Sequence, residues 1–237
     1  MAGRSPSKAS PEDALQSVSR RLAAASHDLQ QPVQAMGLLI EALRKRALPE
    51  DVIAIVDQLA KAHGATRTMV MAMLDLSRFD AGAVRSDPSA LRANDILADL
   101  KATFRPIATD QGVLLRFVPC SAAVRSDPAW IGRILGNLIA NSLNHSGADR
   151  IVVGCRRRDK FLTFEILDQG KGMDPAFLEA ALGGAGEGAG LGLAIVAAAS
   201  TLLGHPIEGV TEPGKGTRIA VSVPLAEGPD DQTLNSA

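Results

Sequence analysis

The chain has 237 residues, 46% of them hydrophobic, enough to fill the cores of two modest domains. Its formal net charge of −1 at pH 7 gives no electrostatic case for binding nucleic acid or an anionic membrane surface. The only two cysteines, Cys120 and Cys155, lack metal-ligand spacing, so we expect ordinary thiols in a reducing compartment and no disulfide.

No segment has the character of a membrane span or a secretory signal. The longest apolar run, Leu191 to Leu203, is interrupted by Ser200 and Thr201 and falls short of the roughly 20 residues that a spanning helix needs. The N-terminus has no apolar stretch of the kind found in signal peptides. We therefore expect a cytoplasmic chain, with no membrane segment in the sequence given.

Two long helices are expected in the first third of the chain. Apolar residues alternate steps of three and four over 15–43 and again over 52–76, with a short turn containing Pro49 between them. Helices joined by so short a turn fold back antiparallel, which predicts a hairpin over 11–82 after a disordered N-terminus, 1–10. One hairpin leaves an apolar side uncovered, so the pattern predicts a homodimer built as a four-helix bundle.

One histidine in this hairpin stands apart from the apolar pattern. His27 falls on the outward side of the first helix, beside Asp28, and Pro32 follows in the next turn. An exposed helical histidine is most often an ordinary solvated residue, and so is an exposed aspartate. A proline inside a helix costs about 3 kcal/mol, which packing alone does not require. The helix by itself leaves the role of His27 open.

After a linker predicted over 83–90, helical and strand patterns mix. The expected elements, in chain order, are a helix at 94–109, a strand at 113–118, a helix at 128–144, strands at 151–158 and 161–168, a helix at 191–203 and a strand at 217–223. This order predicts an α+β sandwich over residues 91–225, with helices on one face of the sheet, and a disordered tail at 226–237.

Three short motifs of this second domain point to a nucleotide. Asp168 follows a strand directly, where its carboxylate can accept from an exocyclic amine, and the glycines after it let the backbone approach a flat ligand. The glycine-rich stretch 188–192 opens a helix, whose free N–H groups favour phosphate. Asn137 and Asn141 share one face of an otherwise apolar helix, and amide oxygens suit Mg²⁺ held with phosphates.

Each of these motifs is weak alone, because each is also found in ordinary turns and packing contacts. Their order, however, resembles the core of a bacterial sensor histidine kinase, a phosphoacceptor hairpin followed by a Bergerat-type ATP-binding domain. The resemblance spans roughly residues 15–225 and rests on six stretches: SHDLQQPV, LDLSRFDAG, NLIANS, DQGKGM, GAGLGLAIV and the turn Gly214 to Thr217.

The resemblance implies specific roles for residues of both domains. His27 would accept the phosphoryl group, Asp28 would act as its general base, and Gln31 would help to dephosphorylate the partner. Asn141 would bind Mg²⁺ and Asp168 the adenine amine of ATP. The residues implied at the nucleotide are Asn137, Asn141, Asn144, Asp168, Gly170, Gly172, Gly188, Gly190, Gly192 and Thr217.

Two positions depart from the family pattern. Asn144 stands where the family commonly has lysine or arginine, and His145 where an aromatic residue often follows, so a cation facing the phosphates is missing. The stretch between Asp174 and Gly190 is short and rich in alanine and glycine, which predicts a small, mobile lid over ATP.

The sequence therefore predicts an ATP-dependent protein-histidine kinase that passes its phosphoryl group to an aspartate of a response regulator receiver domain. A non-catalytic histidine phosphotransferase, whose second domain no longer binds nucleotide, is the main alternative. The intact Asn141 and Asp168 argue against it. An ATPase of chaperone or topoisomerase type is disfavoured by the heptad hairpin and His27.

Overall fold

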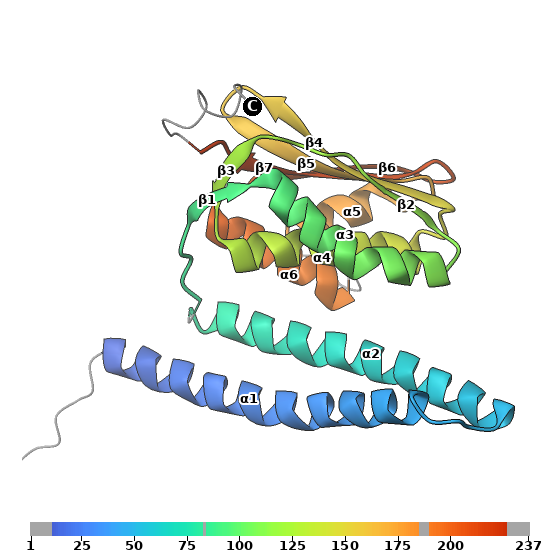
Figure 1. Ribbon diagram of the computed structural model, residues 1–237. Helices are drawn as coiled ribbons and strands as arrows, with labels where there is room; N and C mark the ends of the chain where they lie inside the picture. Colours follow the sequence, from blue (N-terminus) through green and yellow to red (C-terminus); the bar gives the residue numbers. More distant parts are fainter. Residues whose placement is uncertain (1–10, 83, 185–189, 227–237) are drawn as a thin grey trace, which may run out of the picture. The chain divides into compact units, whose positions relative to one another are not determined.

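The computed structural model in Figure 1 describes residues 11–82, 84–184 and 190–226, and its side chains in the first helix from Asp28 onward. The chain divides between Arg85 and Ser86 into two compact units. The two ends predicted to be disordered, 1–10 and 226–237, lie outside the described residues, apart from Ala226. The N–H of Ala226 donates to the Ala123 carbonyl at 3.0 Å.

The first unit is a hairpin of two helices, α1 (Pro11–Arg44) and α2 (Glu50–Asp80). Helix α1 continues through Pro32, and α2 begins directly after Pro49, whose fixed φ suits a helix start. The two helices lie antiparallel, since Val33 of α1 meets His63 of α2 while Arg44 meets Asp57. The predicted helical hairpin is confirmed.

The contact between α1 and α2 is narrow. Among the described side chains of this contact, Val33, Ile40 and Val56 are buried, each 7% exposed or less. The His63 ring Nε2 lies 2.7 Å from the Val33 carbonyl oxygen. A Cβ on Gly37 would lie 2.9 Å from the ring of His63, so this glycine makes room for the imidazole.

The apolar residues of the heptad pattern are mostly not in that contact. Leu39, Ile55, Met69 and Met73 are between 62% and 69% exposed on the single hairpin. The heptad pattern predicts that these residues form the contact between the two helices. In the structure the helices meet instead through residues beside the heptad stripe, Val33, Ile40 and Val56. Two helices bury only the side chains that face one another, and here those side chains lie beside the heptad stripe.

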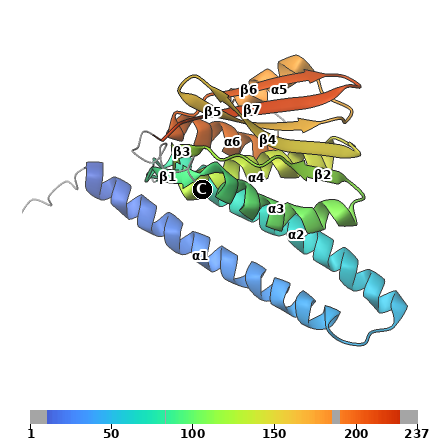
Figure 2. The same ribbon diagram turned by 45° about the horizontal axis from the view of Figure 1, so that its top comes forward.

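The second unit is a sandwich of one sheet and one helical layer. Its main sheet has the order β2-β4-β5-β7-β6, and Figures 1 and 2 show helices α3 to α6 together on one face of it. The strands are β2 (Leu114–Phe117), β4 (Arg150–Arg158), β5 (Phe161–Asp168), β6 (Ile207–Glu212) and β7 (Gly216–Pro224). The helices are α3 (Ala93–Asp110), α4 (Pro128–His145), α5 (Pro175–Leu182) and α6 (Gly190–Leu203). The predicted α+β class is confirmed.

The register of the central strands places the functional loops at one end of the sheet. Strands β4 and β5 form the predicted hairpin around Asp159, which takes a positive φ of 49° in the turn. Strand β5 then pairs with β7 so that Asp168 lies opposite Thr217. The loop after β5 and the loop before β7 therefore lie side by side.

The core lies between the sheet and the helices. Its fully buried side chains come from both layers, which fixes the helices on the sheet by hydrophobic burial. They include Ile131, Ile134, Leu135, Leu138 and Ile139 of α4, Ile151 and Val153 of β4, and Leu162, Phe164 and Ile166 of β5. None of the helices within the described ranges is long and apolar enough to cross a bilayer.

Four elements were absent from the sequence-based expectation. Strands β1 (Ser89–Arg92) and β3 (Ala123–Ser126) pair with each other, so Ser89 and Ala90, predicted as linker, belong to a strand. Strand β6 was also not predicted, because it is an edge strand without the period-two pattern of its neighbours.

The fourth unexpected element, α5, lies in the stretch predicted as a mobile lid. That prediction was wrong for residues 175–182, because Asp174 caps the helix by accepting from the Ala176 N–H at 2.8 Å. Leu178 is 2% exposed and packs with Leu182 over Gly209 of β6. Residues 185–189 of the stretch lie outside the described residues.

Candidate functional site

Asp168 is the centre of a hydrogen-bond network at the end of β5. Its carboxylate is buried, and its Oδ2 accepts from the Ser142 hydroxyl of α4 at 3.2 Å. Its Oδ1 accepts from the backbone N–H of Gly170 at 3.1 Å and of Thr217 at 3.2 Å. Two segments distant in sequence, α4 and β7, and the adjoining loop thus hold one carboxylate in a fixed orientation.

The network leaves Asp168 with capacity to bind a donor. A carboxylate oxygen has about two lone-pair sites, and Oδ1 uses both, whereas Oδ2 has accepted only from Ser142. One acceptor site on Oδ2 is therefore free for an exocyclic amine. An oriented acceptor of this kind loses little freedom when its partner arrives.

Two glycines of the loop after β5 are required by close packing. A Cβ on Gly170 would collide with the Ser146 carbonyl oxygen at the end of α4. Gly172 has a φ of +63°, and a Cβ there would collide with the Glu212 carbonyl oxygen. The backbone of this loop is therefore pressed against α4 on one side and the β6–β7 turn on the other.

The turn before β7 is fixed to the same loop. The Thr211 hydroxyl lies 3.0 Å from that of Thr217, and it also accepts from the Met173 N–H at 3.0 Å. The Gly214 N–H donates to the Lys171 carbonyl at 2.7 Å. These bonds hold Thr217 where its N–H reaches Asp168.

Asn137, Asn141 and Gly192 come together between α4 and α6. A Cβ built on Gly192 would lie 3.2 Å from Asn141 Oδ1 and 3.7 Å from Asn137 Oδ1, so a side chain at this position would crowd both amide oxygens. The Asn141 Nδ2 is buried and has no hydrogen-bond partner among the described residues. Buried amides without partners are uncommon and point to a missing ligand.

The amide group fits a hard cation held together with phosphates. Amide oxygens are ordinary ligands of Mg²⁺, which keeps water and phosphate oxygens in its remaining positions. Within the ranges that the structure describes, there is no cluster of three His, Cys, Asp or Glu side chains suited to a metal. A shared site of Asn141 and phosphate therefore agrees with these residues better than a carboxylate cage.

The start of α6 and the end of α4 complete the surroundings. Gly190 has a φ of +70° and opens α6, whose first N–H groups are directed to its N-terminus. Asn144 and His145 are exposed in the last turn of α4. Gly188, also predicted to contact nucleotide, lies outside the described residues.

Sequence reasoning missed three residues of this network. Ser142 and Ser146 lie one turn apart on α4, and the motif NLIANS itself contains Ser142 next to Asn141. A serine at that place in an apolar helix was a usable signal. Thr211 offered no such signal, because its strand was not predicted.

The hairpin carries the other predicted group of residues. His27 lies within α1, but its side chain is outside the described residues. Asp28 and Gln31 are exposed on α1, and Gln31 follows His27 by one helical turn.

Comparisons with known proteins agree with these motifs. Residues 126–227 match the family described as histidine kinase-, DNA gyrase B-, and HSP90-like ATPase. The sensor histidine kinase RcsC of Escherichia coli K12 is 25% identical over 231 residues, covering 90% of this chain and 24% of RcsC. The autoinducer 2 sensor kinase/phosphatase LuxQ of Vibrio cholerae is 27% identical, covering 88% of this chain and 27% of LuxQ.

The fold is also found among solved structures. Full-length ShkA, crystallised in complex with AMPPNP, aligns with a TM-score of 0.70 at 21% identity, covering 89% of this chain and 47% of ShkA. The chain spans about a quarter of the length of the curated relatives named above. The predicted resemblance to a sensor histidine kinase catalytic core is confirmed by these matches.

Proposed function

We propose that the chain is the catalytic core of a two-component histidine kinase. It would transfer the γ-phosphoryl group of ATP to His27 and then to an aspartate of a response regulator receiver domain. The observation that carries the proposal is the network around Asp168, a buried carboxylate with one oriented acceptor site free, in a unit that matches an ATPase family.

In this proposal the second unit binds ATP by its base and its phosphates. Asp168 accepts from the amino group of adenine, while Gly170 and Gly172 let the loop after β5 pack between α4 and the β6–β7 turn, which fixes the loop beside the base. Thr217 holds the carboxylate from the other side. The N–H groups at the start of α6, in the segment with Gly188, Gly190 and Gly192, would bind phosphate oxygens.

Mg²⁺, when bound, would neutralise charge on the phosphates. Asn141 would supply its amide oxygen to the ion, and Asn137 would lie next to Asn141. The absence of a side chain at Gly192, close to both amide oxygens, supports this arrangement. Asn144 is exposed at the end of the same helix and can donate to a phosphate oxygen, although it brings no positive charge.

On the hairpin, His27 would be the nucleophile. Asp28 would accept a hydrogen bond from one ring N–H, which directs the lone pair of the other nitrogen at the γ-phosphorus. The N–P bond forms as the bond from phosphorus to the bridging oxygen breaks, and ADP leaves. The regulator aspartate then takes the phosphoryl group from His27.

The exposed apolar residues of the hairpin support a homodimer. On one chain, Leu39, Ile55, Met69 and Met73 leave much of their apolar surface in water. Pairing two hairpins would cover this stripe in a four-helix bundle. Because ATP is the phosphoryl donor, we assign the two units to the cytoplasm.

A phosphorylation assay tests the proposal. Incubation of the purified chain with γ-labelled ATP and Mg²⁺ should give a label that is stable in base and lost in mild acid, as expected for phosphohistidine. The variant His27→Ala should lose the label and keep nucleotide binding, whereas Asp168→Ala should lose both. Label persisting in His27→Ala would contradict the assignment of the phosphoacceptor.

The same assay separates the main alternative. A non-catalytic phosphotransferase would take phosphate from a phosphorylated receiver domain but would neither bind ATP nor label itself with it. Tight, Mg²⁺-dependent nucleotide binding by the wild-type chain would therefore rule that alternative out.

A further inference from the structure

The main sheet of the second unit has one face without helices. Helices α3 to α6 cover the other face (Figure 1). Side chains alternate along a strand, and Ile151 and Val153 of β4 with Leu162 and Phe164 of β5 point into the core. The residues between them therefore form the open face, which we name the outer sheet face.

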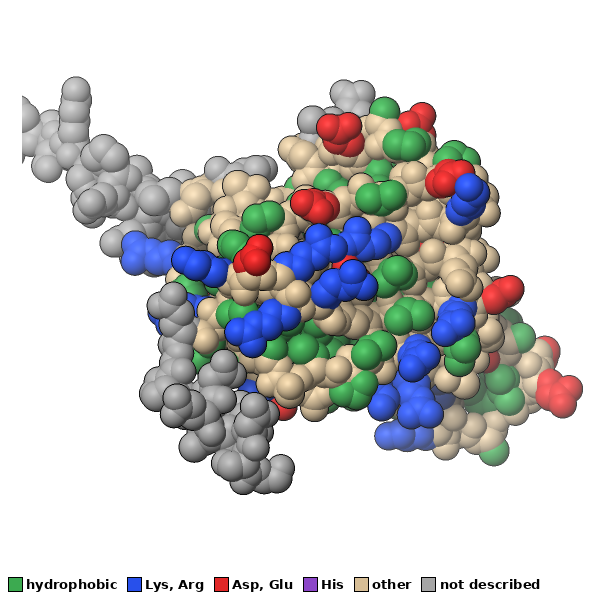
Figure 3. Space-filling view, turned by 90° about the horizontal axis from the view of Figure 1, so that it is seen from above, with side chains coloured by type: hydrophobic (Ala, Val, Ile, Leu, Met, Phe, Trp, Pro, Cys, Tyr) green, Lys and Arg blue, Asp and Glu red, His purple; other side chains and the backbone are tan. Residues whose placement is uncertain are grey.

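Arginines are gathered on the outer sheet face. Arg116 of β2, Arg156 and Arg158 of β4 and Arg218 of β7 all fall on it by strand alternation and register. Figure 3 shows lysine and arginine side chains across the middle of this face and few acidic ones among them. This concentration of charge contrasts with the net charge of −1 for the whole chain.

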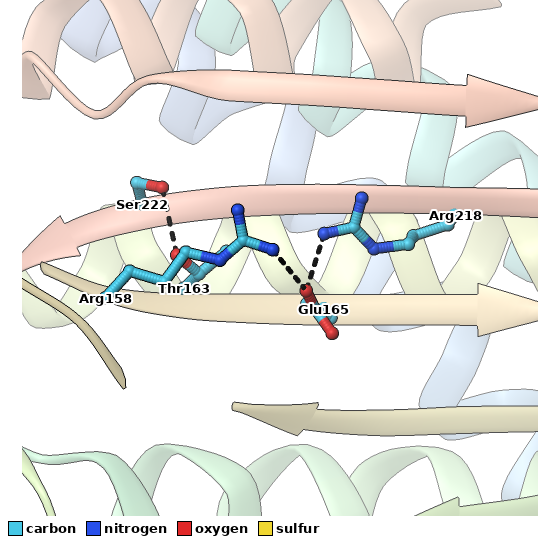
Figure 4. Close-up of polar contacts among 5 residues, drawn as sticks. All are labelled: Arg158, Thr163, Glu165, Arg218 and Ser222. Atoms are coloured by element: carbon cyan, nitrogen blue, oxygen red, sulfur yellow. Dashed lines mark hydrogen bonds and ion pairs between the residues drawn. The ribbon is translucent and has the colours of Figure 1, made fainter. Parts of the chain in front are cut away.

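One carboxylate lies in the middle of these arginines, whereas Glu208 and Glu212 lie at the edge of the face on β6, where Glu212 pairs with Lys215. Figure 4 shows Glu165 of β5 between Arg218, at 2.6 Å, and Arg158, at 3.9 Å. The side chain of Glu165 is 13% exposed, so its charge is shielded by the arginines that it holds. Arg116 and Arg156 are exposed and make no ion pair with any residue that the structure describes.

Apolar side chains lie among the arginines. Leu114 of β2 and Val210 of β6, at opposite edges of the sheet, are each 62% exposed, and Leu167 of β5 is 37% exposed. With strands about 4.8 Å apart and about 3.3 Å per residue, the face measures roughly 600 Å². A standard protein interface buries about 800 Å² per partner, so the face has the right order of size.

We propose that the outer sheet face is a docking surface for an acidic protein partner, one whose carboxylates are interspersed with apolar side chains. Charge complementarity carries this choice, because Glu165 pairs, among the described residues, with Arg158 and Arg218 only, and the positive charges of Arg116 and Arg156 would direct the approach of an acidic surface. The exposed side chains of Leu114, Leu167 and Val210 supply the apolar contacts that an interface needs between its charged groups.

Other anionic partners agree less well with this face. Single-stranded nucleic acid is held by rows of aromatic side chains, and Phe161 is the one aromatic residue of the main-sheet strands on the outer face. Membrane binding by insertion places apolar side chains together at one rim. Here they are spread over β2, β5 and β6, which suits a flat protein surface.

The first step of the test finds the partner. A photo-crosslinking amino acid replaces Leu114 in the full chain, in cells that express the chain at its natural level. The matched control places it at Phe177 of α5, which is 36% exposed and lies outside the sheet. The protein captured at Leu114 and not at Phe177 is purified and becomes the probe.

The second step measures the affinity of that probe for variants with reversed charge. Arg156→Glu with Arg158→Glu should weaken binding at least tenfold, and raising salt from 50 to 500 mM should weaken wild-type binding. The control double variant, Arg157→Glu with Lys160→Glu, makes the same change of charge on the same hairpin but off the outer sheet face. It should bind as the wild type does.

Autophosphorylation of each variant verifies that the second unit is folded, independently of docking. Reversal of carboxylates on the probe should restore binding to the Arg156→Glu, Arg158→Glu variant. The proposal is overturned if Leu114 captures no protein beyond the control, or if both double variants bind alike. It is also overturned if duplex DNA or phosphatidylglycerol vesicles bind this face more tightly than the protein probe.

Discussion

At the scale of single residues, Asp168 connects three segments through one carboxylate. Ser142 from α4, Gly170 from the following loop and Thr217 from β7 all donate to it. A buried carboxylate is stable only with such partners, since burial without them costs several kcal/mol. The same bonds that satisfy the charge also aim its remaining acceptor site.

Asp168→Ala should weaken ATP binding at least tenfold, which corresponds to about 1.4 kcal/mol. Wild-type protein should prefer ATP to GTP, because guanine presents a carbonyl where adenine presents an amine, and two acceptors would face each other. Competition against a fluorescent nucleotide measures both effects. Asp174→Ala, which removes a nearby carboxylate that only caps α5, is the control and should keep its affinity.

Gly170→Ala should lower the stability of the second unit by about 1–3 kcal/mol, because the new Cβ meets the Ser146 carbonyl in a packed region. The control is Gly132→Ala in α4, where no atom lies within 4 Å of the new Cβ. That change should stabilise the helix by about 0.5–1 kcal/mol. Chemical denaturation followed by fluorescence distinguishes the two, and equal midpoints would refute the packing explanation.

Gln31→Ala should keep phosphorylation of His27 and slow the dephosphorylation of the regulator. A glutamine amide can hold a water in line with an acyl phosphate without becoming a nucleophile. Gln34→Ala is the control, because Gln34 is exposed on the same helix but about 10 Å further along its axis from His27. If the regulator loses its phosphate at the wild-type rate with Gln31→Ala, Gln31 has no role in dephosphorylation.

At the scale of elements, the hairpin and the sandwich differ in how they use apolar residues. The sandwich buries its apolar residues between two layers of one chain, as Ile134 and Phe164 show with no exposed surface. The hairpin buries a narrow contact and leaves its heptad stripe in water. An exposed apolar stripe of this kind is typical of a surface that contacts another protein chain.

Leu59→Glu should convert a dimer to a monomer. In one chain Leu59 is 49% exposed, so the glutamate is tolerated there, whereas in a bundle it would be buried unpaired at a cost of several kcal/mol. Ala54→Glu, at an exposed position of α2 off the stripe, should remain dimeric. Light scattering at micromolar concentration gives the mass of each, and a monomeric wild type would contradict the dimer.

At the scale of the whole molecule, the two units have separate cores, and different spectroscopic signals report on their folding. The single tryptophan, Trp130, lies in α4, so its fluorescence follows the second unit alone. Helical circular dichroism follows both units. Perturbations confined to one unit can therefore be assigned to it.

The second unit should lose stability in mild acid through His205. This residue is 4% exposed, its Nε2 lies 2.8 Å from the Ser126 hydroxyl, and burial lowers its pKa below the ordinary value. The unfolded chain then takes up the proton first, so stability is complete above about pH 6.5 and falls as pH decreases below it. The slope is at most about 1.4 kcal/mol per pH unit for one proton.

Denaturation followed by Trp130 fluorescence between pH 5 and pH 8 measures this effect. In His205→Gln the step below pH 6.5 should disappear, even if the variant is less stable at every pH. A wild-type stability that stays flat through this range, or a step that survives in His205→Gln, would show that His205 does not titrate on unfolding.

Local patterns in the sequence determined much of this protein. The long helices followed from heptads, the β4–β5 hairpin from two strand patterns around Asp159, and α4 from its Asp127 cap. These features depend on neighbours within a few residues, where period and capping chemistry decide the conformation. The motifs around Asn141 and Asp168 were recognised for the same reason, because each is a short contiguous stretch.

Only the tertiary structure decided which of these stretches meet. The contacts of Asp168 with Ser142 and with Thr217 join positions 26 and 49 residues apart, and nothing local specifies them. The edge strand β6 exists because β7 offers it a ladder of hydrogen bonds. Likewise burial, and next to it the neighbouring Cys120 thiol, raise the pKa of the Cys155 thiol, although the sequence analysis treated the two cysteines as unrelated. Burial, strand pairing and charge contacts are long-range terms, and the fold alone assigns them to particular residues.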